Sequence, residues 1–133
     1  MPGVLIDSNV LLDVILGTPG WFDWSYSALR DASDSERLII NLVVYAEISV
    51  GYDGIELVDA AIPPVIEREN IPYEAAFLAA KAYRQYRTRG GLRRSPLPDF
   101  FIGAHAAVGG YRILTRDPTP YRTYFPSVRL IAP

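Results

Sequence analysis

The sequence predicts an α/β fold in which a parallel sheet of about five strands lies between two layers of helices. Short apolar, often β-branched runs alternate with longer segments whose apolar residues recur at helical spacing. Such alternation is typical of parallel strands joined by right-handed helical crossovers. Half of the 133 residues are apolar, which is enough to bury a core. No repeat, low-complexity tract or linker interrupts the chain, so we expect a single domain over residues 1–133.

The first predicted strand is the small and apolar run Gly3–Ile6, which leads directly into a polar turn at residues 7–9. A helix is expected over Val10–Leu16, where apolar residues continue. A loop containing glycine and proline follows, and then a second helix over Trp21–Ala32. The chain therefore begins with a strand, a tight turn and two helices.

The middle of the chain contains two further strands. Arg37–Asn41 is too short and too rich in β-branched residues for a helix, so it predicts a second buried strand. Leu42–Val50 and Gly54–Ala61 are expected to be helices, the second of them stopped by two prolines. Val65–Arg68 predicts a weaker strand at an edge of the sheet.

The longest predicted helix is Glu74–Thr88, which two glycines end. A loop over Arg93–Pro98 precedes another helix, Asp99–Val108. The remaining expected elements are a strand over Arg112–Thr115, a turn over Arg116–Pro118, one helical turn over Tyr121–Phe125 and a last strand over Val128–Ile131.

The composition limits the kinds of site that the chain can build. There are no cysteines and only one histidine, His105, so thiolate and histidine-rich metal sites are excluded. Any metal must be bound by oxygen atoms, which favours Mg²⁺ or Mn²⁺. No apolar run approaches the ~20 residues that span a bilayer, and no signal-type segment is evident, so we expect a cytoplasmic protein without membrane contact.

Four acidic residues occupy similar positions relative to the predicted strands, and we call them the four acids: Asp7, Glu47, Asp99 and Asp117. In an open parallel sheet, the carboxyl ends of the strands form one edge, where ligands bind. Four carboxylates in one pocket repel one another, and a divalent cation removes that penalty. We therefore predict a catalytic metal site at this edge, with neutral oxygens from Ser8, Asn9 and Thr115 as supporting polar groups.

Each of the four acids also has a simpler interpretation. Asp7 and Asp117 could be helix N-caps, the latter because Pro118 follows it. Asp99 lies near a helix N-terminus, where an acid gains from the helix dipole. Glu47 could lie on a solvated helix face.

Four segments resemble the PIN domain family, and within it VapC-type toxin ribonucleases. They stand in the family's order and at its usual spacing. Chain length and strand–helix order also match, so the resemblance spans nearly the whole chain. The segments are Val4–Leu11, Val44–Ile48, Leu97–Ala106 and Ile113–Asp117.

The resemblance implies a PIN-like three-layer α/β/α sandwich and a Mg²⁺- or Mn²⁺-dependent endoribonuclease that hydrolyses RNA phosphodiester bonds. It implies that the four acids form the metal-binding cluster, with Asn9 and Thr115 as support. It also implies a small antitoxin partner, as in VapBC-type toxin–antitoxin pairs, and a homodimer. The chain departs from the family pattern at Ser8, where threonine is common, and at Pro118 and Pro120, which affect the loop after Asp117.

A local basic segment precedes Asp99 in a chain of net charge −2. Such a segment favours binding to RNA phosphates, although a solvated helix end explains it as well. Arg116, next to Asp117, is a further candidate phosphate ligand. The segment contains Lys81, Arg84, Arg87, Arg89, Arg93 and Arg94.

Other features leave alternatives open. The aromatic cluster around Trp21 and Trp24 fits either a partner interface or core packing, and His105 fits a structural or interface role. A non-catalytic PIN-like RNA-binding or scaffold module is the alternative function.

Two other kinds of α/β domain match the sequence less well. A haloacid-dehalogenase-like phosphatase needs a second acid at the position where this chain has Asn9. A receiver domain needs a late lysine, and Lys81, the only lysine, lies on the long predicted helix.

Overall fold

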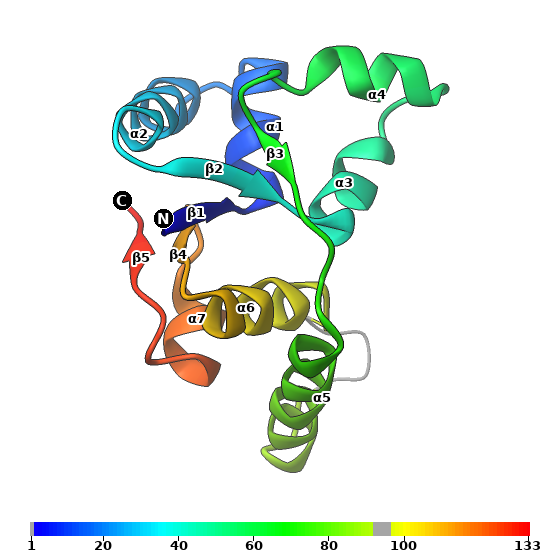
Figure 1. Cartoon of the computed structure of the whole chain (residues 1–133), viewed down its shortest axis with the longest axis vertical. Helices are drawn as coiled ribbons and strands as arrows, with labels where there is room; N and C mark the ends of the chain where they lie inside the picture. The colour runs from blue at the N-terminus through cyan, green and yellow to red at the C-terminus, as the bar shows by residue number, and fades with distance from the viewer. Residues whose placement is uncertain (1, 92–96) are drawn as a thin grey trace.

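The computed structural model describes residues 2–91 and 97–133, and its elements follow the predicted alternation of strands and helices (Figure 1). In chain order they are β1 (Gly3–Ile6), α1 (Ser8–Leu16), α2 (Phe22–Ser33), β2 (Arg37–Ile40), α3 (Leu42–Ser49), α4 (Ile55–Ala61), β3 (Glu67–Arg68), α5 (Tyr73–Thr88), α6 (Leu97–Gly109), β4 (Arg112–Leu114), α7 (Thr119–Tyr124) and β5 (Leu130–Ile131).

The strands form one sheet in the order β3-β2-β1-β4-β5, and every pair of neighbours is parallel. Leu5 of β1 is in register with Ile39 of β2 on one side and with Ile113 of β4 on the other. All four residues of β1 are buried, as expected of a central strand covered on both faces. The predicted α/β fold with a five-stranded parallel sheet is therefore confirmed.

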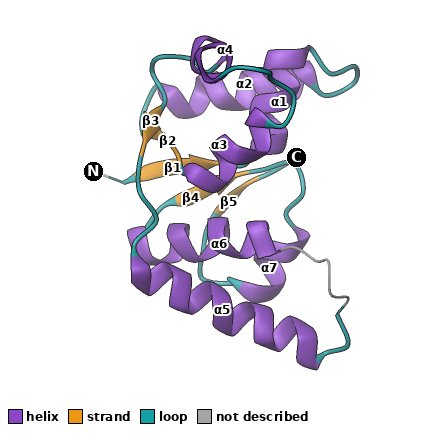
Figure 2. Cartoon of the chain, turned by 90° about the vertical axis from the view of Figure 1, so that its right-hand side faces the viewer, coloured by secondary structure: helices purple, strands orange, loops and turns teal. Residues whose placement is uncertain are grey.

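Helices cover both faces of the sheet. Helices α1 to α4 lie on one face, and α6 and α7 lie on the other (Figures 1 and 2). Helix α5 packs against α6, on the side away from the sheet (Figure 2). The layers match the predicted α/β/α sandwich, with α5 as an additional outer helix.

The order of the strands places a topological switch point, and the crevice that goes with it, between the ends of β1 and β4. The chain leaves β1 through α1 on one face and leaves β4 through α7 on the other (Figure 1). The amide of Asp7 donates to the carbonyl oxygen of Leu114 at 2.9 Å, so the two strand ends are level. In open α/β sheets such a switch point is where ligands bind.

Several predicted boundaries were wrong by a few residues. Helix α1 begins at Ser8 instead of Val10, and α6 begins at Leu97 instead of Asp99, because a proline such as Pro98 fits the first turn of a helix. Strand β3 is shorter than predicted, with only Glu67 and Arg68 paired to β2. The predicted loop residues 93–96 lie outside the described part of the chain.

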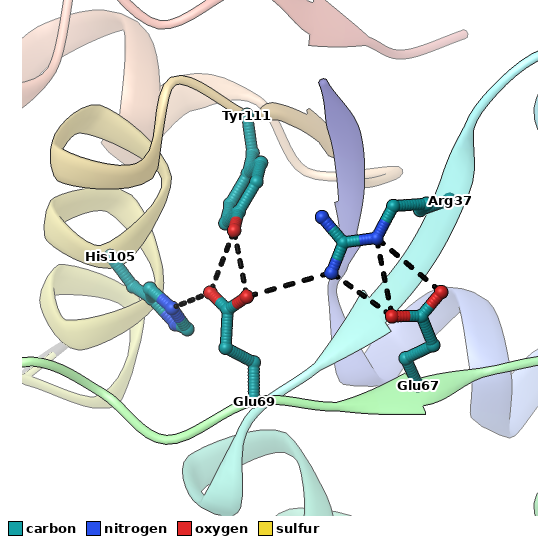
Figure 3. A network of polar contacts seen from close by, with 5 residues as sticks. All are labelled: Arg37, Glu67, Glu69, His105 and Tyr111. Carbon is teal, nitrogen blue, oxygen red and sulfur yellow. Dashed lines mark hydrogen bonds and ion pairs between the residues drawn. The ribbon is translucent and has the colours of Figure 1, made fainter. Parts of the chain in front are cut away.

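His105 is fully buried on α6 and belongs to a polar network that joins α6 to β2 and β3 (Figure 3). Asn41 caps α3 with its side-chain oxygen, so its amide nitrogen faces His105 Nδ1 at 3.1 Å. Nδ1 is then the acceptor, and Nε2 donates to Glu69 at 2.8 Å. The Tyr111 hydroxyl also donates to Glu69, at 2.7 Å, and Nη2 of Arg37 lies 3.7 Å from Oε1 of the same carboxylate. His105 therefore has a structural role.

No helix within the described ranges, 2–91 and 97–133, is long and apolar enough to cross a membrane.

Candidate functional site

Asp7 follows the central strand and is 4% exposed. Its Oδ2 accepts hydrogen bonds from Thr115 Oγ1 and from the Tyr121 hydroxyl, each at 2.8 Å, and a longer one from Asn9 Nδ2 at 3.5 Å. Asp7 occupies the N-cap position of α1, but its carboxylate makes no capping hydrogen bond. Its side chain is directed to β4 and α7, which the simpler N-cap interpretation does not explain.

Tyr121 is a candidate site residue that the sequence pattern does not identify. It lies on α7, its side chain is 1% exposed, and its hydroxyl donates to Asp7. Burial and the nearby carboxylates of Asp7, Asp99 and Glu47 raise the pKa of Tyr121 well above its ordinary value, so it stays a proton donor. The only sequence signal for Tyr121 is its position four residues after Asp117, and that spacing is not specific to a functional site.

Thr115 links Asp7 to the turn that follows β4. Its hydroxyl donates to Asp7 and accepts from the amide of Asp117 at 3.0 Å. Asn9 holds the same turn, because its side-chain oxygen accepts from the amide of Arg116 at 3.3 Å. The alternative interpretation of Asp117 as an N-cap is wrong, since Pro118 occupies that position in α7. Asn9 and Thr115 therefore fix both sides of the β1–β4 crevice.

Glu47 reaches the same region from α3. Its Oε1 accepts from Ser8 Oγ at 2.9 Å, and its side chain is partly buried. The alternative of a solvated helix face is therefore wrong. Burial raises the pKa of Glu47, the Ser8 hydrogen bond lowers it, and the negative charge of Asp7 raises it further.

Asp99 carries the clearest electrostatic sign that the four acids meet. It lies in the first turn of α6 and is partly buried. Burial, followed by the charges of Asp7, Glu47 and Asp117, raises its pKa to about 7. Burial also raises the pKa of Asp7, partly offset by its hydrogen bonds to Tyr121 and Thr115, while Asp117 adds repulsion. Mutual repulsion of this kind requires four segments distant in sequence to lie close in space.

The donor set of the site suits a hard cation. Within residues 2–91 and 97–133, no three acidic or histidine side chains already converge in the geometry of a metal site. The polar groups near one another are carboxylates and hydroxyls, and the carboxyl groups of Asp7, Glu47 and Asp99 have raised pKa values. Oxygen ligands with excess negative charge fit Mg²⁺ or Mn²⁺, which would remove the repulsion.

The arginines predicted to contact RNA lie in two places. Arg84, Arg87 and Arg89 are at the C-terminal end of α5, where the side chains of Arg84 and Arg89 are exposed. A shallow cavity of about 360 Å³ is lined there by Lys81, Arg84, Gln85, Thr88 and Arg89.

Arg89 also lies over the ring of Tyr124 on α7, at 5.5 Å, which connects this basic end to the element that follows Asp117. Arg116 lies in the turn beside the acids. Arg93 and Arg94 fall outside the described residues.

Comparison with known proteins supports the same family. A family model for the PIN domain matches residues 4–126. VapBC2 from Rickettsia felis, bound to a DNA fragment from its promoter, has a TM-score of 0.75 at 16% identity, with 97% of each chain covered. DNA-bound VapBC from Salmonella typhimurium has a TM-score of 0.73 at 17% identity, with 99% of this chain and 98% of the other covered.

A toxin–antitoxin complex from Klebsiella pneumoniae has a TM-score of 0.70 at 22% identity, with 95% of each chain covered. These identities establish a shared fold. No curated protein matches the chain by sequence. With the family model spanning nearly all of the sequence, the chain belongs to the PIN domain family.

Proposed function

We propose that this PIN domain chain, one domain over residues 1–133, is a metal-dependent endoribonuclease that hydrolyses RNA phosphodiester bonds. The observation that carries the proposal is the repulsion that Asp7, Glu47 and Asp117 exert on the partly buried Asp99. A protein gains nothing in stability from bringing buried carboxylates together, so such a group is a candidate functional site.

The four acids are the proposed ligands of one or more Mg²⁺ or Mn²⁺ ions. Such an ion supplies an activated water at neutral pH and neutralises charge on the phosphate. All three side-chain donors to Asp7 contact Oδ2, and in the described part of the chain no side chain donates to Oδ1. This arrangement fixes the carboxylate in one orientation.

Neutral side chains position the acids. Ser8 orients Glu47, Thr115 orients both Asp7 and the backbone of Asp117, and Asn9 holds the turn between them. Catalysis of phosphoryl transfer depends mainly on positioning and electrostatic stabilisation, which this network supports.

The RNA backbone is proposed to run from the acids toward the basic end of α5. Its candidate phosphate ligands are cations in an otherwise acidic chain, and their charge would offset the repulsion between RNA and the four acids. The proposed ligands are Arg84, Arg87, Arg89, Arg93, Arg94 and Arg116.

The proposed biological role is that of the toxin in a VapBC-type toxin–antitoxin pair, acting in the cytoplasm. The supporting observation is that the similar solved structures include VapBC and other toxin–antitoxin complexes, matched over almost their full length. A small antitoxin protein would then cover the acid site, and a homodimer is the proposed assembly.

The test is RNA cleavage as Mn²⁺ or Mg²⁺ is titrated into the wild-type protein and into the Asp7→Asn and Asp99→Asn variants. Wild type is expected to cleave only with the cation. Each variant should lose cleavage by about 100-fold or more, roughly the effect of losing a key catalytic group. Asp34→Asn is the control, because Asp34 is exposed and precedes β2, at the opposite edge of the sheet. RNA binding without cleavage at any cation concentration would instead indicate the non-catalytic module.

A further inference from the structure

Arg116 has an unusual environment for a residue in a turn. Its Nε lies 3.1 Å from Asp13 Oδ2 on α1, and its guanidinium carbon lies 4.8 Å from the centre of the Trp21 ring. Asn9 and Asp13 are four residues apart on α1 and therefore share a face. Asn9 binds the backbone of Arg116, and Asp13 binds its side chain, so the arginine lies along this face of the helix.

Asp13 is a charged group placed where charge is costly. It is 1% exposed, and its Oδ2 also accepts from Ser25 Oγ on α2 at 2.7 Å. A buried carboxylate is tolerated when it is paired and hydrogen-bonded. Asp13 and Ser25 therefore form an anchor that holds one cation, and the cation that they hold is Arg116.

The anchor uses only part of the guanidinium. Nε is buried, and its contact with Asp13 is an ion pair without hydrogen-bond geometry. The side chain of Arg116 is nevertheless 30% exposed, so the exposed area belongs to its other atoms. Among residues 2–91 and 97–133, no group hydrogen-bonds to either terminal nitrogen of Arg116. Those nitrogens are the donors that bind phosphate oxygens in pairs.

We propose that Arg116 binds a phosphate of the RNA next to the one that is cleaved, and that Asp13 and Trp21 are positioning residues for its guanidinium. The inference rests on the proposed ribonuclease function and adds a specific substrate contact to it. The carboxylate holds the inner edge of the guanidinium and the indole ring covers one face, which leaves its outer nitrogens for the ligand. Pre-ordering an arginine in this way lowers the entropy cost of each contact that it makes.

The experiment separates binding of phosphate from support of the fold. Single-stranded RNA is titrated into proteins that carry Asp7→Asn, which prevents cleavage, and the dissociation constant is measured by fluorescence anisotropy between about 50 and 200 mM salt. Arg116→Gln should weaken binding about tenfold and lower the salt slope by about 0.7, the value for one phosphate contact on a single strand. Arg116→Lys should retain the slope, because the charge remains.

A double variant isolates the two roles. Arg116→Gln leaves Asp13 buried without its cation, so the melting temperature should fall. Adding Asp13→Asn removes that charge, and the melting temperature should recover while the salt slope stays low. Recovery of RNA affinity together with the melting temperature would overturn the proposal and leave Arg116 a purely structural role.

Asp13→Asn alone tests the anchor. The guanidinium stays charged but is no longer held, so we expect weaker RNA binding with an unchanged salt slope. An affinity equal to that of wild type would remove Asp13 from the proposal. Arg30→Ala is the matched control, since Arg30 also lies over an aromatic ring, at 6.0 Å from the centre of Tyr26, and should leave binding unchanged.

The result is separable from the test of the proposed function. If wild type cleaves RNA and Arg116→Gln binds it normally, the phosphate contact is excluded while the ribonuclease stands. If wild type does not cleave but the Arg116→Gln effect on the salt slope is present, the contact stands in a non-catalytic RNA-binding protein. Absence of RNA binding in every variant would overturn both.

Discussion

Asp7 receives three side-chain donors on a single oxygen, and the strongest geometry comes from Thr115 and Tyr121. These bonds stabilise the ionised carboxylate against the burial that raises its pKa. The two hydroxyls therefore keep a nearly buried acid available as an anionic ligand. They also fix its orientation, which a ligand of a small cation requires.

Replacing Tyr121 with Phe tests this role. The variant loses one donor to Asp7, so the pKa of Asp7 should rise further, and the cation should bind more weakly at neutral pH. Thermal unfolding should show a stability loss of about 1 to 3 kcal/mol, typical of a buried hydrogen bond to a charged group. Calorimetric Mn²⁺ titration at several pH values measures the effect. Tyr26→Phe, at an exposed position on α2, is the control, and identical Mn²⁺ affinity in both variants would contradict the assignment.

Some residue-level features could be predicted from the sequence and others could not. The four acids could be proposed from the sequence because Asp7, Asp99 and Asp117 lie close to a strand end or helix start, and Glu47 lies on the helix that follows a strand. Tyr121 could not be identified from the sequence, because a tyrosine in a short helical turn after two prolines fits a surface position equally well. The contact between Asp13 and Arg116 was also hidden, because no local pattern links helix α1 to a turn near the far end of the chain.

At the scale of elements, α5 is an outer helix that carries part of the proposed RNA contact surface. It packs against α6 and not directly on the sheet, and its C-terminal end is rich in cations. Its contact with α7 through Arg89 and Tyr124 brings that basic end beside the element after Asp117. In the proposed ribonuclease, an outer helix of this kind would add RNA-binding surface without changing the layers that position the acids.

Replacing Arg87 and Arg89 with Ala should therefore weaken RNA binding without disturbing the acid site. Both residues lie at the exposed end of α5, so the melting temperature should change little. The salt slope for single-stranded RNA should fall by about 0.7 for each phosphate that is no longer neutralised. Anisotropy titrations over a range of salt concentrations measure it. An unchanged salt slope would favour the alternative interpretation, in which these arginines belong to a solvated helix end.

Element order and type were predictable, while boundaries were less so. Every predicted strand is present, because short β-branched runs bounded by turn residues are a strong signal. The predicted start of α6 was wrong because a leucine followed by a proline, Leu97 and Pro98, is typical of a loop, although the first turn of a helix also accepts proline. The sequence left a structural and an interface role open for His105, because its partner Glu69, beyond a two-residue strand, gives no sequence signal.

For the molecule as a whole, Asp99, Asp7 and Glu47 make the metal-free fold sensitive to pH. The pKa of Asp99 in the folded protein is about 7, against an ordinary value of 3.8. Between these values the folded protein keeps a proton that the unfolded chain has lost. The free energy of unfolding therefore falls as the pH rises from about 4 to about 7, and the loss is complete above that range. Asp7 and Glu47, whose pKa values are also raised, act with the same sign.

Thermal melting in the presence of a chelator measures this dependence. The Asp99→Asn variant should show a flatter dependence of melting temperature on pH. It should be more stable than wild type at pH values above about 7, because the repulsion between carboxylates is removed. Added Mn²⁺ should raise the melting temperature of wild type most at high pH, where the acids are ionised. Asp34→Asn should keep the wild-type slope, and a variant at Asp99 that melts lower than wild type at high pH would argue against crowding of the carboxylates.

The position of β1 at the centre of the sheet has a consequence for synthesis. Asp7 precedes its hydrogen-bond donors Thr115 and Tyr121 by 108 and 114 residues, and β4 supplies its neighbouring strand. A ribosome-bound fragment that stops before β4 lacks half of the crevice. Under the proposed ribonuclease function, such a fragment would lack a complete acid site and would not cleave the messenger that is being translated.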